Sequence, residues 1–206
     1  VNNLIIVTPS QWLLKLVNQS FLKEYDSICI NNGIDLSIFS PRHSDFRKKY
    51  GLENKRVILG VAFEWGYRKG LDIFTKLSRI LDSRYVIVLI GYNGQLHIEN
   101  LITIGRTNNQ IELAEIYSAA DVFLNPTRED NFPTVNIEAL ACGTPVVTFD
   151  NGGSKEMIDE TCGIVLADED VETIKSTIDE LIDSNKIKAQ ACRNKALEYD
   201  YKKKFK

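Results

Sequence analysis

Residues 121–149 read DVFLNPTREDNFPTVNIEALACGTPVVTF and contain two apolar runs with a helical pattern between them. The runs Asp121–Asn125 and Pro145–Phe149 are short and apolar almost throughout, which is typical of parallel strands buried on both faces. The segment Thr134–Cys142 is apolar nearly all round, so the pattern indicates a buried helix. Pro133 suits the first turn of such a helix, and Gly143 suits its left-handed end. This stretch therefore predicts a strand–helix–strand unit of an α/β protein.

The same alternation continues on both sides of this unit. Further strands are predicted at Leu4–Thr8, Ser27–Ile30, Arg56–Ala62, Tyr85–Ile90, Leu101–Ile104 and Gly163–Leu166. Further helices are predicted at Gln11–Val17, Gly70–Asp82, Ile111–Ala120, Val171–Asp183 and Lys186–Tyr199. The segment Asn31–Asp45 is loop-rich and joins residues 1–30 to the repeating units. Strands and helices that alternate through short loops predict a Rossmann-like, doubly wound parallel sheet, whose ligands bind beyond the carboxyl ends of the strands.

Composition limits the classes of function. The chain has 206 residues and a net charge of −3, which fits one α/β domain and disfavours nucleic acid as a partner. Its apolar runs are too short to cross a membrane, and no signal peptide is recognisable. The four cysteines and two histidines lack the spacing of metal ligands, so we expect free thiols in the cytoplasm and no metal site.

Two cations stand side by side after the strand predicted at 56–62, in Gly66-Tyr67-Arg68-Lys69-Gly70. We expect Arg68 and Lys69 to lie at the start of a helix, where the positive end of the dipole makes cations unfavourable. A bound phosphate would reverse this sign and accept the free amides. A solvated loop with two ordinary surface charges explains the same residues equally well, so both interpretations stay open.

A carboxylate interrupts the apolar helix predicted over 134–142. Glu138 needs a partner there, because a buried charge without one is costly. One interpretation is a buried salt bridge. We favour a carboxylate that accepts hydrogen bonds from two ribose hydroxyls, because Glu138 lies close to the helix N-terminus where a ligand is expected.

The strand predicted over 145–149 is followed by Asp150-Asn151-Gly152-Gly153-Ser154. Two glycines let a backbone pass close to a ligand, although a plain turn with Ser154 as a helix N-cap explains them too. The acidic triplet Asp168-Glu169-Asp170 is predicted to cap the next helix rather than to bind a metal. The chain has no G-x-G-x-x-G motif, which disfavours a dehydrogenase.

Taken together, these segments resemble the C-terminal, donor-binding domain of the retaining GT-B glycosyltransferases of group 1. The resemblance covers nearly the whole chain. It rests on Arg68-Lys69-Gly70, on the run from Leu113 to Thr127, and on Glu138-Ala139-Leu140-Ala141-Cys142-Gly143-Thr144-Pro145. Val7-Thr8-Pro9-Ser10 resembles the end of the family's N-terminal domain. We therefore expect residues 1–26 to be the last strand and helix of a missing N-terminal domain, or a linker, and residues 27–206 to be the donor-binding domain.

The resemblance also implies roles for the site residues. Lys69 and Arg68 would neutralise the departing diphosphate, and Asp130 would hold a hydroxyl of the transferred sugar. Glu138 would hold the ribose. The other residues expected at the donor are Asn131, Phe132, Thr134, Val135, Arg106, Thr107 and Gly153. No metal or other cofactor is implied.

Three positions depart from the family pattern. The first of its two glutamates falls on Asp130, and its glycine after the aromatic residue is Pro133, which lacks an amide N–H. Its phosphate-binding arginine falls on Phe63, so Arg68 is the candidate to replace it. The run Glu129-Asp130-Asn131-Phe132-Pro133 is similar to a subgroup that assembles bacterial surface polysaccharides.

The implied substrate is a nucleotide sugar, with UDP-sugar favoured over GDP-sugar. The acceptor, a glycan or a lipid-linked glycan, would bind the missing N-terminal domain, and the full-length protein would work in the cytoplasm or at the inner face of the cytoplasmic membrane. This chain alone is expected to be inactive. Two alternatives stay open: a nucleotide-sugar epimerase of the same fold, and a catalytically inert binding module.

Overall fold

The computed structural model of the chain describes residues 4–94, 96–107 and 109–204. Within these residues, a six-stranded parallel sheet has the order β5-β4-β3-β6-β7-β8, and a separate parallel pair joins β1 to β2. The strands are β1 (Ile5–Thr8), β2 (Asp26–Cys29), β3 (Arg56–Val61), β4 (Tyr85–Ile90), β5 (Leu101–Ile104), β6 (Val122–Asn125), β7 (Val146–Phe149) and β8 (Gly163–Leu166).

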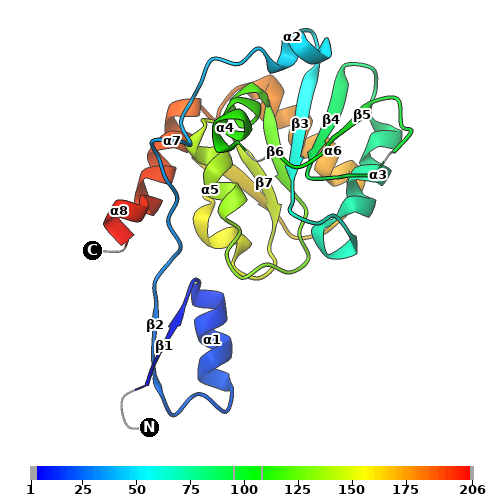
Figure 1. Ribbon diagram of the computed structural model, residues 1–206. Coiled ribbons are helices and arrows are strands. Elements are labelled where there is room, and N and C mark those ends of the chain that lie inside the picture. The colour runs from blue at the N-terminus through cyan, green and yellow to red at the C-terminus, as the bar shows by residue number, and fades with distance from the viewer. Residues whose placement is uncertain (1–3, 95, 108, 205–206) are drawn as a thin grey trace.

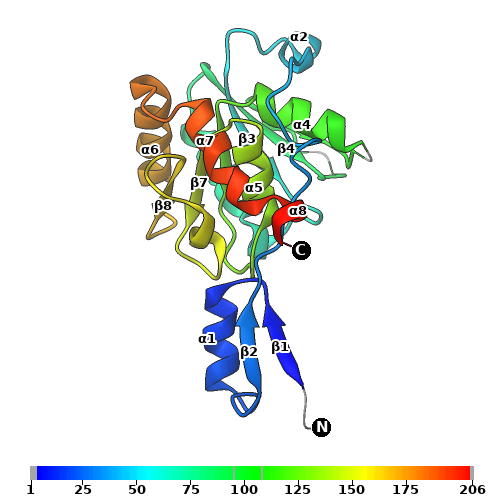
Figure 2. The same cartoon turned by 90° about the vertical axis from the view of Figure 1, so that its left-hand side faces the viewer.

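Helices cover both faces of the six-stranded sheet, as Figures 1 and 2 show. The core on one face includes residues of α4, α5 and α7, and the core on the other includes residues of α3 and α6. The helices are α1 (Gln11–Gln19), α2 (Phe46–Tyr50), α3 (Leu71–Ile80), α4 (Gln110–Ala119), α5 (Thr134–Ala141), α6 (Val171–Ser184), α7 (Ala189–Ala196) and α8 (Tyr201–Lys204), with 3₁₀ turns η1 (Tyr67–Lys69), η2 (Ser154–Met157) and η3 (Leu197–Tyr199). The predicted doubly wound α/β fold is confirmed.

The central strands are apolar because both of their faces are covered. Successive side chains of β3 point to opposite faces, so Val57 and Leu59 join the core of α4, α5 and α7, whereas Ile58 joins the core of α3 and α6. Every residue of β4 is buried. This two-sided burial explains why the strands appear as continuous apolar runs rather than as alternating patterns.

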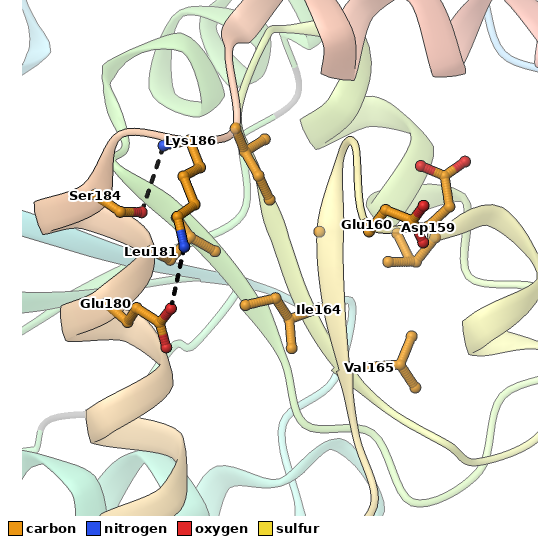
Figure 3. A pocket seen from close by; sticks show the side chains of 11 residues that line it. Asp159, Glu160, Ile164, Val165, Glu180, Leu181, Ser184 and Lys186 are labelled. Carbon is orange, nitrogen blue, oxygen red and sulfur yellow. Dashed lines mark hydrogen bonds and ion pairs between the residues drawn. The ribbon is translucent and has the colours of Figure 1, made fainter.

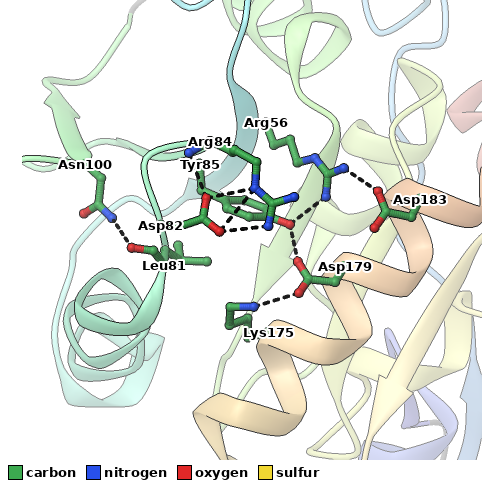
Figure 4. Close-up of polar contacts among 9 residues, drawn as sticks. All are labelled: Arg56, Leu81, Asp82, Arg84, Tyr85, Asn100, Lys175, Asp179 and Asp183. Carbon is green, nitrogen blue, oxygen red and sulfur yellow. Dashed lines mark hydrogen bonds and ion pairs between the residues drawn. The ribbon is translucent and has the colours of Figure 1, made fainter.

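A charged cluster fastens α6 to the amino ends of β3 and β4 (Figure 4). Arg56 donates through Nη1 to the Tyr85 hydroxyl at 2.8 Å and also pairs with Asp183. The Tyr85 hydroxyl in turn donates to Asp179, and burial raises the pKa of this phenol. The cluster lies at the amino ends of the strands, away from the carboxyl ends where a ligand is expected. We therefore interpret it as a set of contacts that stabilise the fold.

The unit formed by β1, α1 and β2 stands apart from the sheet domain and is joined to it by an extended segment (Figures 1 and 2). α1 has no buried residue, and β1 leaves Ile5 58% and Val7 55% exposed. β2 pairs with β1 over Asp26–Cys29 and not with the six-stranded sheet. The assignment of the unit to a neighbouring domain stays a prediction.

Some predicted elements differ from the structure. The helix predicted over Lys186–Tyr199 begins only at Ala189 and continues from α7 into η3, where the Tyr199 carbonyl accepts from the Ile34 amide at 2.9 Å. α2 and the 3₁₀ turns were not predicted, since they are too short to show a periodic pattern. No helix in the described part of the chain is long and apolar enough to cross a membrane.

Candidate functional site

The order of the strands reverses between β3 and β6, which are neighbours in the sheet although β4 and β5 lie between them in the sequence. Doubly wound sheets bind their ligands beyond the carboxyl ends of the strands at this switch point. The chain that leaves β3 carries Lys69, and the chain that leaves β6 carries Asp130. Their side chains form an ion pair with a Nζ–Oδ2 distance of 2.5 Å, and they are 20% and 19% exposed. Two of the predicted catalytic residues therefore meet at the switch point.

The loop of residues 126–133, which carries Asp130, is held in place by glycines that follow β7. The Gly153 amide donates to the Asp130 carbonyl at 2.9 Å. A Cβ atom on Gly153 would lie 2.1 Å from the carbonyl oxygen of Asn131, and one on Gly152 would lie 2.2 Å from that of Asp130. The close approach that these glycines permit is therefore to the 126–133 loop. Gly153 was expected to face a ligand, but in this structure its amide has an internal acceptor.

The cations of the phosphate-binding candidate do not lie in the first turn of α3. Arg68 and Lys69 belong to η1, which ends at Gly70 with a φ of 73° before α3 begins at Leu71. Lys69 directly precedes Gly70, the N-cap of α3, and its charge is paired with that of Asp130. Arg68 is exposed beside this pair, and its Nη1 atom approaches the Glu129 carbonyl oxygen at 3.5 Å.

The amino end of α5 faces this loop without a side-chain cap. Its N-cap is Pro133, and among the described residues neither the Thr134 amide nor the Val135 amide has a hydrogen-bond acceptor. The Phe132 amide differs, since it donates to Oδ1 of Asp130 at 3.1 Å. A side chain caps α1, α4 and α6, whereas α2, α3 and α7 lack a side-chain cap, as α5 does. Two of the predicted amide donors are therefore available to an anion, and that of Phe132 is engaged by Asp130.

The carboxylate within α5 has a neutral partner rather than a cation. The hydroxyl of Tyr117, in α4, donates to Oε2 of Glu138 at 3.1 Å, and no Lys or Arg of the described segments pairs with Glu138. Burial raises the pKa of Glu138 to about 7, although hydrogen bonds from Tyr117 and Thr134 act in the opposite direction. The buried salt bridge considered from the sequence is therefore not present. Tyr117 was not predicted as a site residue, because only the fold brings α4 against α5.

Arg106 and Thr107 follow the carboxyl end of β5, which is an outer strand of the six-stranded sheet. The Thr107 hydroxyl donates to Glu112 at 2.7 Å and so supports the first turn of α4. The guanidinium of Arg106 lies over the ring of Phe63, with its central carbon 3.5 Å from the ring centroid. None of the described contacts joins Arg106 or Thr107 to the Lys69–Asp130 pair. Arg106 thus places a cation against position 63.

A cavity of about 430 Å³ lies elsewhere, between β8 and the end of α6 (Figure 3). Its walls include Ile164 and Leu181, and Glu180 pairs with Lys186 at 3.6 Å along one side. It contains none of the predicted site residues. Within the acidic triplet, Asp170 caps α6 by accepting from the Thr173 amide at 2.9 Å, as predicted, whereas Glu169 pairs with Arg128 of the 126–133 loop at 2.6 Å.

A parallel sheet with a switch point, with a cation and a helix start at the carboxyl ends of its strands, defines a Rossmann-like α/β domain. The family profile described as Glycosyl transferases group 1 matches residues 43–199, and the chain belongs to this family. The resemblance stated from the sequence is thereby confirmed.

Relatives with known names agree with this family. The chain is 27% identical over 170 residues to a D-inositol 3-phosphate glycosyltransferase of Mycolicibacterium smegmatis, covering 75% of this chain and 39% of that protein. It is 26% identical over 202 residues to a GDP-mannose-dependent monoacylated alpha-(1-6)-phosphatidylinositol monomannoside mannosyltransferase of Corynebacterium glutamicum, covering 87% of this chain and 53% of the relative. The chain thus spans about half the length of these relatives or less.

Solved structures share the fold. A sucrose-phosphate synthase from Thermosynechococcus elongatus superposes with a TM-score of 0.83 at 21% identity, covering 97% of this chain and 55% of that one. HepE from Anabaena, in complex with UDP and glucose, gives a TM-score of 0.82 at 17% identity and 97% and 60% coverage. WaaG, a glycosyltransferase involved in lipopolysaccharide biosynthesis, gives 0.78 at 20% identity and 95% and 59% coverage.

Proposed function

We propose that this chain is the donor-binding half of a retaining glycosyltransferase, which moves a sugar from a nucleoside diphosphate to an acceptor hydroxyl in the assembly of a bacterial surface polysaccharide. WaaG, a protein of the same fold, is involved in lipopolysaccharide biosynthesis, which is a related process. UDP-sugar is the favoured donor, since HepE binds UDP, although the name of one relative specifies GDP-mannose.

The observation that carries this proposal is the uncapped amino end of α5 beside the Lys69–Asp130 pair. The reaction requires stabilisation of the negative charge that develops on the leaving diphosphate. Lys69, Arg68 and the amides of Thr134 and Val135 supply positive charge and hydrogen-bond donors without a metal. Among the described residues, no group of three His, Cys, Asp or Glu side chains is placed to share a metal ion.

The two carboxylates have separate roles in this proposal. Asp130 holds Lys69 at the switch point and then binds a hydroxyl of the transferred sugar. Glu138 accepts hydrogen bonds from the ribose, whose hydroxyls give this partly buried carboxylate donors in addition to those of Tyr117 and Thr134.

We further propose that the unit of β1, α1 and β2 completes a neighbouring domain that binds the acceptor, a glycan or a lipid-linked glycan. Its support is the exposed apolar surface of Ile5, Val7 and Ile28, which a folded protein in water would normally cover.

Isothermal titration of the chain with UDP and with GDP tests the donor site. Removal of a charge-assisted contact to the diphosphate costs about 1.5–3 kcal/mol, so Lys69→Ala should weaken binding roughly tenfold to a hundredfold. Glu138→Gln should also weaken it. The matched controls are Lys76→Ala, an exposed lysine of α3, and Glu53→Gln, an exposed acid before β3. If neither nucleotide binds, or if the site variants bind as tightly as the controls, the proposal is wrong.

A further inference from the structure

Two backbone amides at the start of α1 are bound by a carboxylate from a distant part of the chain. Glu156, in η2, accepts from the Gln11 amide at 2.9 Å and from the Trp12 amide at 2.7 Å, one with each carboxylate oxygen. Ser10 caps the same turn locally, since its Oγ atom accepts from the Leu13 amide at 3.1 Å. A negative charge is favourable at this end of a helix, and its hydrogen bonds are charge-assisted. Glu156 is thus the contact through which η2 holds α1.

The residues just before Glu156 contact the candidate donor site. Gly153 donates to the Asp130 carbonyl, as described above, and the Ser154 carbonyl accepts from Nδ2 of Asn136 at 3.3 Å. Asn136 lies in the first turn of α5, is fully buried and accepts from Asn125 at 2.8 Å. The segment 153–156 is therefore bonded on one side to the 126–133 loop and α5, and on the other side to α1.

Gly153 is closely packed between the 126–133 loop and the start of α1. A Cβ atom there would lie 2.1 Å from the Asn131 carbonyl oxygen and 2.9 Å from Cβ of Ser10, the N-cap of α1. By contrast, the adjoining junction is open, with a cavity of about 520 Å³ between α1 and the loop 150–152. Trp12, Lys15 and Arg128 are among its lining residues. The orientation of α1 therefore depends on the contacts of segment 153–156, including the close approach of Gly153 to Ser10, rather than on packing across the cavity.

We propose that Glu156 is a positioning residue that couples the orientation of α1 to the 126–133 loop and the amino end of α5. A movement of the β1–α1–β2 unit is transmitted through Glu156 and Gly153 to the backbone of Asp130, and so to its partner Lys69. The significance of this coupling for donor binding rests on the function proposed above, whereas the coupling is a property of the chain itself.

Amide hydrogen exchange, followed by NMR on the labelled chain, tests the contact and the coupling separately. In Glu156→Ala, loss of the charge-assisted bonds should speed the exchange of the Gln11 and Trp12 amides by about tenfold. The Phe132 amide, which reports on Asp130, should exchange faster or shift its resonance. Glu156→Gln keeps one acceptor oxygen and should give a smaller effect. The control is Glu160→Ala, which removes an exposed acid four residues farther along.

Unchanged exchange at Gln11 and Trp12 in Glu156→Ala would show that the contact does not hold α1. If these amides change while Phe132 does not, Glu156 is only a local cap and the coupling is refuted. Titration with UDP provides the functional arm: Glu156→Ala should weaken binding several-fold. Failure of the unaltered chain to bind UDP would refute the proposed function but would not affect the result on the amides. Failure of the proposed function and failure of the proposed coupling are therefore distinguishable.

Discussion

Glu138→Gln tests whether the carboxylate of α5 is kept for a ligand or serves the fold. Burial raises the pKa of Glu138 from its ordinary value of 4.5 to about 7. The folded chain therefore holds this proton more tightly than the unfolded chain, and ionisation weakens the fold as the pH rises from 4.5 to 7. At 1.36 kcal/mol per pKa unit, the ionised carboxylate costs on the order of 3 kcal/mol above pH 7.

Glutamine keeps the shape of the side chain and an acceptor for Tyr117, but it cannot ionise. We expect Glu138→Gln to be more stable than the unaltered chain by about 1–3 kcal/mol at pH 8, and by about 1 kcal/mol or less at pH 5, where the carboxyl is largely protonated. Urea unfolding followed by circular dichroism at both pH values measures the difference in the free energy of unfolding.

The opposite result would refute this reasoning. A loss of about 3–5 kcal/mol at both pH values is the expected consequence of breaking a buried ion pair, and it would make Glu138 structural. Glu53→Gln, the exposed control, should change stability by less than about 0.5 kcal/mol at either pH.

Three further predictions follow from the site. Lys69→Ala should lower stability by about 1–3 kcal/mol, because it leaves the mostly buried carboxylate of Asp130 without its partner, and denaturant melts would contradict this by showing a gain. A chelator should leave the affinity for UDP unchanged in calorimetry, and loss of binding would show that a metal is required. Gly153→Ala should cost about 1–3 kcal/mol in thermal melts, because its Cβ atom has no space against Asn131; an unchanged melting temperature would contradict this close packing.

The sequence predicted those features of the structure that depend on the residues of a single segment. The buried strands appear as apolar runs, and alternation with helices predicts a parallel sheet, whose carboxyl edge indicates where a ligand binds. Lys69 was found in this way and Asp130 through the family resemblance, but the direct pairing of the two was not predicted. Side-chain partners depend on how loops from different strands meet, and 61 residues separate these two.

The same limit explains the residues that were missed. The pairing of Glu138 with Tyr117 needs α4 packed on α5, and the pairing of Glu156 with α1 joins positions 144 and 145 residues apart. The double glycine at 152–153 was recognised as a site of close backbone approach. Its neighbour proved to be the 126–133 loop, which a sequence pattern cannot distinguish from a ligand.

The separation of the β1–α1–β2 unit from the sheet domain has a consequence for the cooperativity of unfolding. The chain has two tryptophans, and each part holds one. Trp12 lies in α1, whereas Trp65 donates to the Ile90 carbonyl at 2.9 Å and packs edge-on against Phe74 in the sheet domain. A two-stranded unit with few buried side chains opens at a lower free energy than a domain with two cores. The emission of Trp12 should therefore change at a lower denaturant concentration than that of Trp65. An unfolding curve followed by total tryptophan fluorescence should then contain two transitions rather than one.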